Sequence, residues 1–113
     1  MLLWVADIII ASEDALFSDP TVGFGVNGVE YHAHGWEWGA RKAKELLFTG
    51  DWITAQEAHQ RGMVNHVVPR GELHAFTMAL ARKIIEDHHG TIEVFGEKGK
   101  GSTFVIRLPV VET

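Results

Sequence analysis

The chain opens with an apolar run that is typical of a buried strand. Residues 2–11, LLWVADIIIA, are almost continuously hydrophobic and contain several β-branched side chains, with Asp7 as the charged exception. Runs of this kind form strands covered on both faces, because neither face carries the alternating polar residues of a half-exposed strand. We therefore expect a strand over residues 2–11, then a turn and a short extended piece that ends at Pro20.

Two helices are expected after a loop that contains several glycines. Between residues 31 and 48 the apolar residues recur at helical spacing, and Gly50 is placed to end that helix in a left-handed conformation. Thr54 and Glu57 then form a capping box, in which the hydroxyl accepts from a free backbone amide and the carboxylate reaches back. The second helix is therefore expected to begin at Thr54 and to end at Gly62.

The second half of the chain predicts a strand, a long helix and a hairpin. Residues 63–68 form a short apolar run that stops at Pro69, and residues 72–88 carry apolar side chains one helical turn apart. Gly90 can end that helix by adopting the left-handed conformation. From residue 91 onward, apolar and polar residues alternate on both sides of a charged turn with glycines, which is typical of an antiparallel hairpin.

This order of elements predicts an α/β (α+β) protein. We expect residues 1–113 to form a single domain with a mixed β-sheet, helices packed on it and a C-terminal antiparallel hairpin. A chain of 113 residues has room for one hydrophobic core. Its 46% hydrophobic and 22% charged residues fall in the ordinary range of folded domains.

Charge and composition exclude several classes of partner. The formal net charge of −5 argues against nucleic acid, because affinity for a phosphate backbone depends on clustered Lys and Arg. The apolar opening is shorter than the roughly 20 residues that span a bilayer, so no membrane partner is expected. The chain has no cysteine, which excludes disulfides and thiolate metal sites and fits a cytoplasmic protein obtained by recombinant expression.

Two segments carry a family resemblance. They are ADIIIASEDALFSDP, which begins at residue 6, and ARKAKELLFTGDWITAQEAHQRGMVNHVVP, which ends at Pro69. They resemble the enoyl-CoA hydratase (crotonase) family over about residues 6–83, and the block from Thr49 to Pro69 is the most specific part. The resemblance implies a site for acyl-CoA thioesters, built from two backbone amides that form an oxyanion hole and usually two carboxylates that act as acid and base.

The same resemblance implies that the catalytic groups are absent. The oxyanion amides and one carboxylate belong before the first strand, and the second carboxylate follows the Pro of the extended piece, where this chain has Thr21. A hydroxyl does not replace a carboxylate as general base without an activating partner. We therefore expect no catalytic residue, interpret Asp19, Glu30 and Glu37 as solvated surface charges, and keep Thr21, Glu30 and Glu37 as candidates for acyl-CoA contact.

The tail has a second resemblance. Residues 83–110, KIIEDHHGTIEVFGEKGKGSTFVIRLPV, resemble the last helix and hairpin of histidine-kinase ATPase domains, with GKGSTF as the most specific part. The elements that hold ATP and magnesium in those kinases lie before this helix, so Ser102 is the one candidate for nucleotide contact. The two resemblances meet in one helix, which divides the chain into a crotonase-like segment, 1–83, and a kinase-like segment, 84–113.

The histidines and tryptophans have plain structural interpretations. The chain has seven histidines, but a zinc site needs three or four convergent ligands, so His32, His34 and the pair at 88–89 are interpreted as surface residues without a metal. No cofactor is expected. A segment cut from a larger domain should expose apolar surface, which includes its tryptophans, so self-association into a homodimer is expected.

Three functional hypotheses follow. The first is an engineered or recombined chimera, a folded scaffold with no native catalytic function. The alternative is residual acyl-CoA binding or weak enoyl-CoA hydratase-like lyase activity that uses the loop from Thr21 to Glu37. The third is nucleotide binding through the tail.

Overall fold

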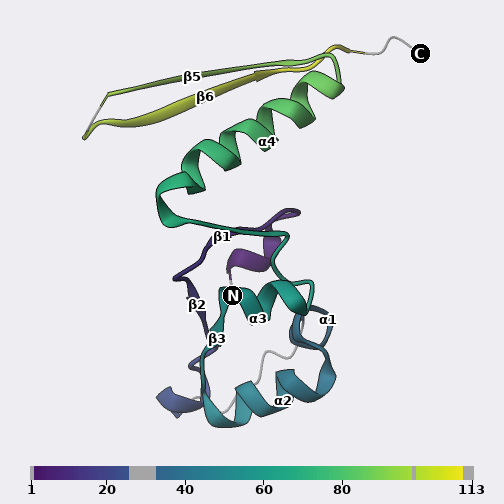
Figure 1. Cartoon of the computed structure of the whole chain (residues 1–113), viewed down its shortest axis with the longest axis vertical. Coiled ribbons are helices and arrows are strands. Elements are labelled where there is room, and N and C mark those ends of the chain that lie inside the picture. The colour runs from purple at the N-terminus through teal and green to yellow at the C-terminus, as the bar shows by residue number, and fades with distance from the viewer. Residues whose placement is uncertain (1, 26–32, 98, 111–113) are drawn as a thin grey trace. The chain divides into compact units, whose positions relative to one another are not determined.

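The computed structural model describes residues 2–25, 33–97 and 99–110. Contacts within the chain group it into two compact units, unit 1 (Met1–Leu73) and unit 2 (His74–Thr113). Figure 1 labels the elements of both units. The helices and 3₁₀ turns are η1 (Leu2–Val5), η2 (Val22–Phe24), α1 (His34–Trp38), α2 (Ala40–Thr49), α3 (Ala55–Gln60), η3 (Arg70–Glu72) and α4 (Leu73–Asp87). The strands are β1 (Ile10–Ser12), β2 (Leu16–Phe17), β3 (Ile53–Thr54), β4 (His66–Val68), β5 (Thr91–Glu97) and β6 (Gly101–Arg107).

Unit 1 contains two short ladders. β1 pairs with β4 in parallel, from Ile10 opposite His66 onward. Asn65 extends this ladder, because its side-chain oxygen accepts from the Ile9 amide at 2.8 Å and its own amide donates to the Ile9 carbonyl at 2.8 Å. β2 pairs with β3 in antiparallel fashion. The two ladders connect the start of the unit to its later half.

The apolar opening is not one buried strand, as expected, but a 3₁₀ turn followed by a short strand. η1 occupies Leu2–Val5, and β1 covers only Ile10–Ser12. Ile9 and Ala11 are buried whereas Ile8 is exposed. Only one face of the run is therefore buried, because alternate residues of a strand point to opposite sides. The continuous hydrophobic sequence had suggested burial of both faces.

The helix expected over residues 31 to 48 is divided. α1 ends at Trp38 and α2 begins at Ala40, with Gly39 between them at φ 78° and ψ 143°. Only glycine adopts this conformation without steric cost. The expected end is confirmed, because Gly50 is left-handed at φ 72° and its amide donates to the Leu46 carbonyl at 2.8 Å.

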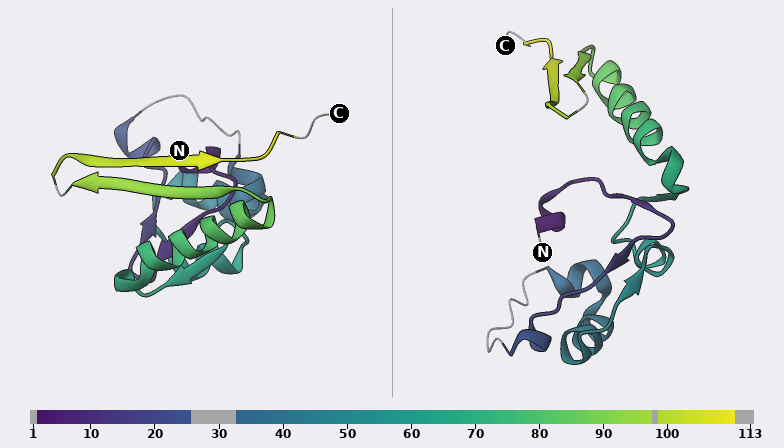
Figure 2. Two further views of the ribbon diagram at one scale, coloured as in Figure 1. Left: turned by 90° about the horizontal axis from the view of Figure 1, so that it is seen from above. Right: turned by 90° about the vertical axis from the view of Figure 1, so that its left-hand side faces the viewer.

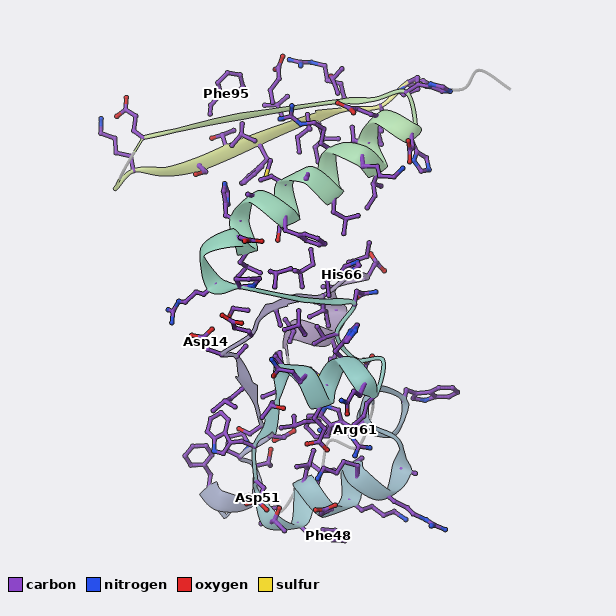
Figure 3. The ribbon with its side chains drawn as sticks, viewed as in Figure 1. Asp14, Phe48, Asp51, Arg61, His66 and Phe95 are labelled. Atoms are coloured by element: carbon purple, nitrogen blue, oxygen red, sulfur yellow. The ribbon has the colours of Figure 1, made fainter. Side chains whose placement is uncertain are left out.

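One of the two hydrogen bonds of the predicted capping box of α3 is confirmed. The Thr54 hydroxyl accepts from the Glu57 amide at 3.2 Å, as expected. The Glu57 carboxylate does not reach back and instead accepts from the Arg61 guanidinium at 2.9 Å. Arg61, labelled in Figure 3, also donates to the Trp38 carbonyl at 3.3 Å and so connects the end of α3 to the end of α1.

The core of unit 1 lies between α2, α3 and the short strands. α2 contributes Ala43 and Leu46, and α3 contributes Ala55 and Ala58, all of them almost completely buried. The buried cluster consists of Ile9, Ala11, Trp38, Ala43, Leu46, Ile53, Ala55, Ala58, Met63 and Val64. The small alanines on both helices leave room for the large Trp38 side chain. The burial of Trp38 in turn positions α1 and the site described below.

Unit 2 is a helix followed by a hairpin, as expected. β5 and β6 pair in antiparallel fashion from Thr91 opposite Arg107 to Glu97 opposite Gly101, and Figure 2 shows the two strands side by side in both views. Phe95 points away from the strands in Figure 3. Among the described residues of this unit, only Ile85 is classed as buried. Unit 2 therefore has a much smaller core than unit 1.

The end of α4 differs from the expectation. His89, not Gly90, is the left-handed residue, with φ 59°. Gly90 is needed for another reason, because a Cβ atom there would lie 2.6 Å from the Arg107 carbonyl oxygen and 2.9 Å from Ile85 Cγ2. The glycine therefore permits the close approach of the helix end to the end of β6.

The expected class of mixed helices and strands with a C-terminal hairpin is confirmed. The described strands pair as three two-stranded ladders in place of one mixed sheet, because β1 to β4 are only two or three residues long. Whether residues 1–113 fold as a single domain stays a prediction. In the described part of the chain, no helix is long and apolar enough to cross a membrane.

Candidate functional site

Asp19 and Thr21 form a tight turn at the start of η2. The Asp19 carboxylate oxygen Oδ1 accepts from the Thr21 amide at 3.2 Å and also from the Thr21 hydroxyl. The bond to the amide two residues later is an Asx turn, which Pro20 between them favours by fixing its own φ. Asp19 is only 8% exposed, although it carries a charge.

His34 completes the cluster from the first position of α1. Its Nε2 atom lies 2.8 Å from the second carboxylate oxygen of Asp19, Oδ2, and the residue is 2% exposed. An ionised carboxylate only accepts hydrogen bonds, so the proton of this bond is on Nε2. We call Asp19, Thr21 and His34 the buried polar triad, since one carboxylate connects two segments of unit 1.

Aromatic side chains surround the imidazole. The Trp4 ring meets His34 edge-on with centroids 4.7 Å apart, and the Trp38 ring does so at 5.5 Å. The two indoles are themselves 5.2 Å apart, and Trp38 Nε1 donates to the Met63 sulfur at 2.7 Å. Such surroundings have a low effective dielectric, which strengthens the Asp19–His34 interaction and penalises any loss of one partner.

The pKa of Asp19 is lowered by its hydrogen bonds. Burial is the largest influence and acts to raise this pKa, because it disfavours the charged carboxylate. The hydrogen bonds from the Thr21 hydroxyl, His34 and the Thr21 amide together outweigh it. The net direction is downward, so Asp19 is ionised near neutral pH and acts as an acceptor.

The candidate residues do not all meet at one place. Thr21 is half-buried in the triad, and Glu37 is half-buried on α1, three residues after His34, where no described residue forms a hydrogen bond or ion pair with its carboxylate. Glu30 lies outside the described residues. Ser102 is exposed on β6 of unit 2, where it lines a shallow hollow with Gly96 and other residues of the hairpin.

The interpretation of Asp19 and His34 as surface residues is wrong. Both are buried, and they pair with each other across 15 residues of sequence. A local signal existed for half of the triad, because an Asp two residues before a Thr, with Pro between, is a typical Asx-turn pattern. No local pattern could have connected His34 to this turn. The described part of the chain holds no group of three or more His, Asp or Glu residues that could bind a metal ion.

Comparison with known proteins places this geometry in a family context. A family model described as enoyl-CoA hydratase/isomerase matches residues 1–100 of the chain. EchA13 of Mycobacterium tuberculosis, which is named as an enoyl-CoA hydratase, is 55% identical over 86 residues, or 74% of this chain. Methylmalonyl-CoA decarboxylase of Escherichia coli is 38% identical over 99 residues. A crystal structure from Mycobacterium thermoresistibile that carries the name enoyl-CoA hydratase is 63% identical over 72% of this chain, with a TM-score of 0.67.

The chain covers only part of each of these proteins. It spans 27% of EchA13, 38% of the decarboxylase and 34% of the crystallised chain. Most of each of these proteins therefore lies outside the match, and the family resemblance places the oxyanion amides and one carboxylate before the first strand. Their absence here does not show that the protein lacks catalytic residues.

The hypothesis of an engineered or recombined scaffold with no native catalytic function is wrong. Relatives named for acyl-CoA enzymes match most of this chain, and the family model continues past residue 83, where the two segments were expected to join. That hypothesis had taken two features as signs of a site without function: the oxyanion amides and carboxylate that do not occur in this chain, and the presence of Thr21 where the family has a carboxylate. The alternative hypothesis, an acyl-CoA function, agrees better with these relatives.

Proposed function

Because this chain belongs to the enoyl-CoA hydratase/isomerase family, we propose that it binds acyl-CoA thioesters and supplies part of a hydratase-like lyase site. The observation that carries the proposal is the buried polar triad. It lies in the loop where the family resemblance places a catalytic carboxylate directly after Pro20, and it puts the Thr21 hydroxyl there. A buried charge that accepts three hydrogen bonds and pairs with an imidazole beside two indole rings is costly to maintain, which favours a functional role.

The chemistry of the triad suits positioning better than proton abstraction. Hydration of an enoyl thioester needs a group that aligns water near carbon 3 while donors stabilise the enolate oxygen. The lowered pKa of Asp19 makes its carboxylate a weak base, whereas the Thr21 oxygen is held in place and can accept a hydrogen bond. We therefore assign alignment to Thr21 and support of Thr21 to Asp19 and His34.

Isothermal titration of the purified chain with 3-hydroxybutyryl-CoA tests this proposal, with free coenzyme A as the comparison ligand. Binding of the thioester at micromolar concentration, weakened by the substitution Thr21→Val, is the expected result. Thr103→Val provides a matched control, because Thr103 is an exposed threonine on β6 of unit 2. Two results would contradict an acyl-CoA site at the triad. One is a folded chain that does not bind the thioester at all, and the other is an equal loss of affinity for the thioester with both substitutions.

We also propose that residues 84–113 are a histidine-kinase-like helix end and hairpin. The segment GKGSTF and the helix-to-hairpin order support this likeness, whereas the match of the family model through residue 100 counts against it. The proposal implies that the tail takes no part in thioester binding. A chain that ends at His88 should therefore bind 3-hydroxybutyryl-CoA as the whole chain does, and loss of binding by a folded shortened chain would refute this implication.

A further inference from the structure

The hydrogen bonds of the triad fix which way the Thr21 hydroxyl points. Its proton goes to Asp19 Oδ1, and the other carboxylate oxygen accepts from His34 Nε2 at 2.8 Å. A hydroxyl has one proton to donate and two lone pairs that accept. Since the proton is used inside the triad, only the lone pairs of Thr21 Oγ1 remain for a ligand.

We propose that Thr21 is a specificity-determining residue that accepts a hydrogen bond and therefore selects thioesters with a hydroxyl on the acyl chain over those with an oxo group. The inference rests on the proposed function and adds to it the direction of the hydrogen bond, in which the ligand donates and Thr21 accepts. A hydroxyl at carbon 3, where conjugate addition of water places it, donates to Thr21 Oγ1. An oxo group at the same carbon offers only lone pairs, so it faces another acceptor and loses the contact.

Asp19 and His34 act through Thr21 as positioning residues. If Thr21 could rotate freely, its hydroxyl would donate to an oxo group as readily as it accepts from a hydroxyl. The ionised Asp19 prevents this, and His34 holds that carboxylate in place among the rings of Trp4 and Trp38. The preference for a donor therefore depends on the buried Asp19 and His34 and on the half-buried Thr21.

Burial makes the discrimination measurable. An acceptor that is left facing another acceptor loses its hydrogen bond to water without replacement, and such a loss costs more than the net value of one bond. A neutral hydrogen bond contributes about 1 kcal/mol net, which corresponds to roughly a fivefold change in affinity, and the mismatch adds to this. We expect the hydroxy ester to bind about tenfold more tightly than the oxo ester.

Three thioesters of equal chain length provide the test. The whole chain is titrated with 3-hydroxybutyryl-CoA, acetoacetyl-CoA and butyryl-CoA, which differ only at carbon 3. The unsubstituted chain should prefer the hydroxy ester. Thr21→Val, which keeps the shape but removes the hydroxyl, should bring the three affinities within about twofold, and Thr21→Ser should keep the preference.

A second substitution tests the role of the carboxylate. Asp19→Asn replaces an acceptor by a group that can also donate, so the proton of Thr21 is no longer required inside the triad. The preference for the hydroxy ester over the oxo ester should then fall or reverse. Thr103→Val on β6 should leave all three affinities unchanged.

The outcomes separate this inference from the proposed function. If none of the three thioesters binds the folded chain, the proposed function fails and the inference fails with it. If the thioesters bind but the hydroxy and oxo esters bind equally, or the oxo ester binds more tightly, the inference alone is overturned. If Thr21→Val does not fold, the ligand series on the unsubstituted chain and on Thr21→Ser still decides.

Discussion

The stability of unit 1 depends on the charge of Asp19. Its pKa is lowered because the hydrogen bonds from Thr21 and His34 outweigh burial, which acts in the opposite direction. A carboxylate with a lowered folded pKa contributes stability that is present above the unfolded value, about 3.9, and is lost as pH falls through the folded value. We therefore expect the free energy of unfolding to decrease below about pH 4.

Asp19→Asn isolates this contribution. The variant should be less stable than the unsubstituted chain at pH 6, and the difference should shrink as pH falls below about 4. Urea unfolding at pH values between about 2.5 and 6, followed by tryptophan fluorescence, measures both curves. Parallel curves over the whole range would show that Asp19 is not the group responsible. The comparison uses Trp4 and Trp38, which lie around His34, as built-in reporters.

His89 holds a conformation that suits glycine. Its φ of 59° places an ordinary L-residue in the left-handed region, which costs about 1 kcal/mol. His89→Gly should therefore stabilise unit 2 by roughly 0.5 to 1 kcal/mol, measured as a higher urea midpoint. His88→Gly is the matched control and should destabilise, because it removes the bond from His88 Nδ1 to the Ile84 carbonyl at 2.8 Å. Equal changes in the urea midpoint for the two substitutions would show that the His89 backbone is not strained.

At the scale of elements, the connection between α4 and the hairpin depends on Gly90. A Cβ atom at this position would lie 2.6 Å from the Arg107 carbonyl oxygen and 2.7 Å from Leu108 Cδ2. Backbone cannot yield cheaply, so Gly90→Ala should destabilise unit 2 by about 1 to 3 kcal/mol. Gly71→Ala is the control, because a methyl group at Gly71 would meet no atom within 4 Å and Gly71 has no left-handed φ. Circular dichroism during urea unfolding compares the two.

Local patterns predicted the elements that local chemistry determines. The left-handed Gly50 after α2, the Thr54 cap of α3 and the alternation of β5 and β6 are all visible in the sequence. The break at Gly39 is not, because a glycine inside a helical pattern is often tolerated and the burial of Trp38 before it is a tertiary feature.

The site was predictable only in part. The place of Thr21 after Pro20 marks it as a candidate, whereas the charge of Asp19 taken alone suggests a surface residue. The contact that defines the triad joins Asp19 to His34, which are 15 residues apart with a loop between them. Such a pairing comes from tertiary packing, which neither spacing nor composition reports.

At the scale of the whole molecule, the two units differ in how much apolar surface they bury. Unit 1 has a cluster of ten buried residues, whereas Ile85 alone is buried in the described part of unit 2. A two-stranded hairpin is marginal in water unless more strands or a packed face support it. Phe104 and Ile106 on β6 remain 52% and 54% exposed. Unit 2 is therefore the part of the chain that would gain most from a partner.

We predict that a second copy of the chain pairs with the outer edge of β6. Over Gly101–Arg107 this strand has no proline and a single charged residue, so it lacks the devices that usually protect an edge. β5 carries two charged residues, Glu93 and Glu97, and charged side chains on an edge strand disfavour pairing with another chain. An antiparallel pair of β6 strands about Phe104 brings no like charges opposite each other and forms a four-stranded sheet.

Thr103→Lys should weaken this homodimer, because it places two lysines near the proposed pairing edge. Thr91→Lys is the matched control: Thr91 and Thr103 are both exposed, and the ladder puts them on the same face, but Thr91 belongs to β5. Sedimentation at concentrations from about 5 to 200 µM should show a dimer for the unsubstituted chain and for Thr91→Lys, and a monomer for Thr103→Lys. A monomeric unsubstituted chain would refute the homodimer, whereas a dimer that survives both substitutions would place the interface elsewhere than β6.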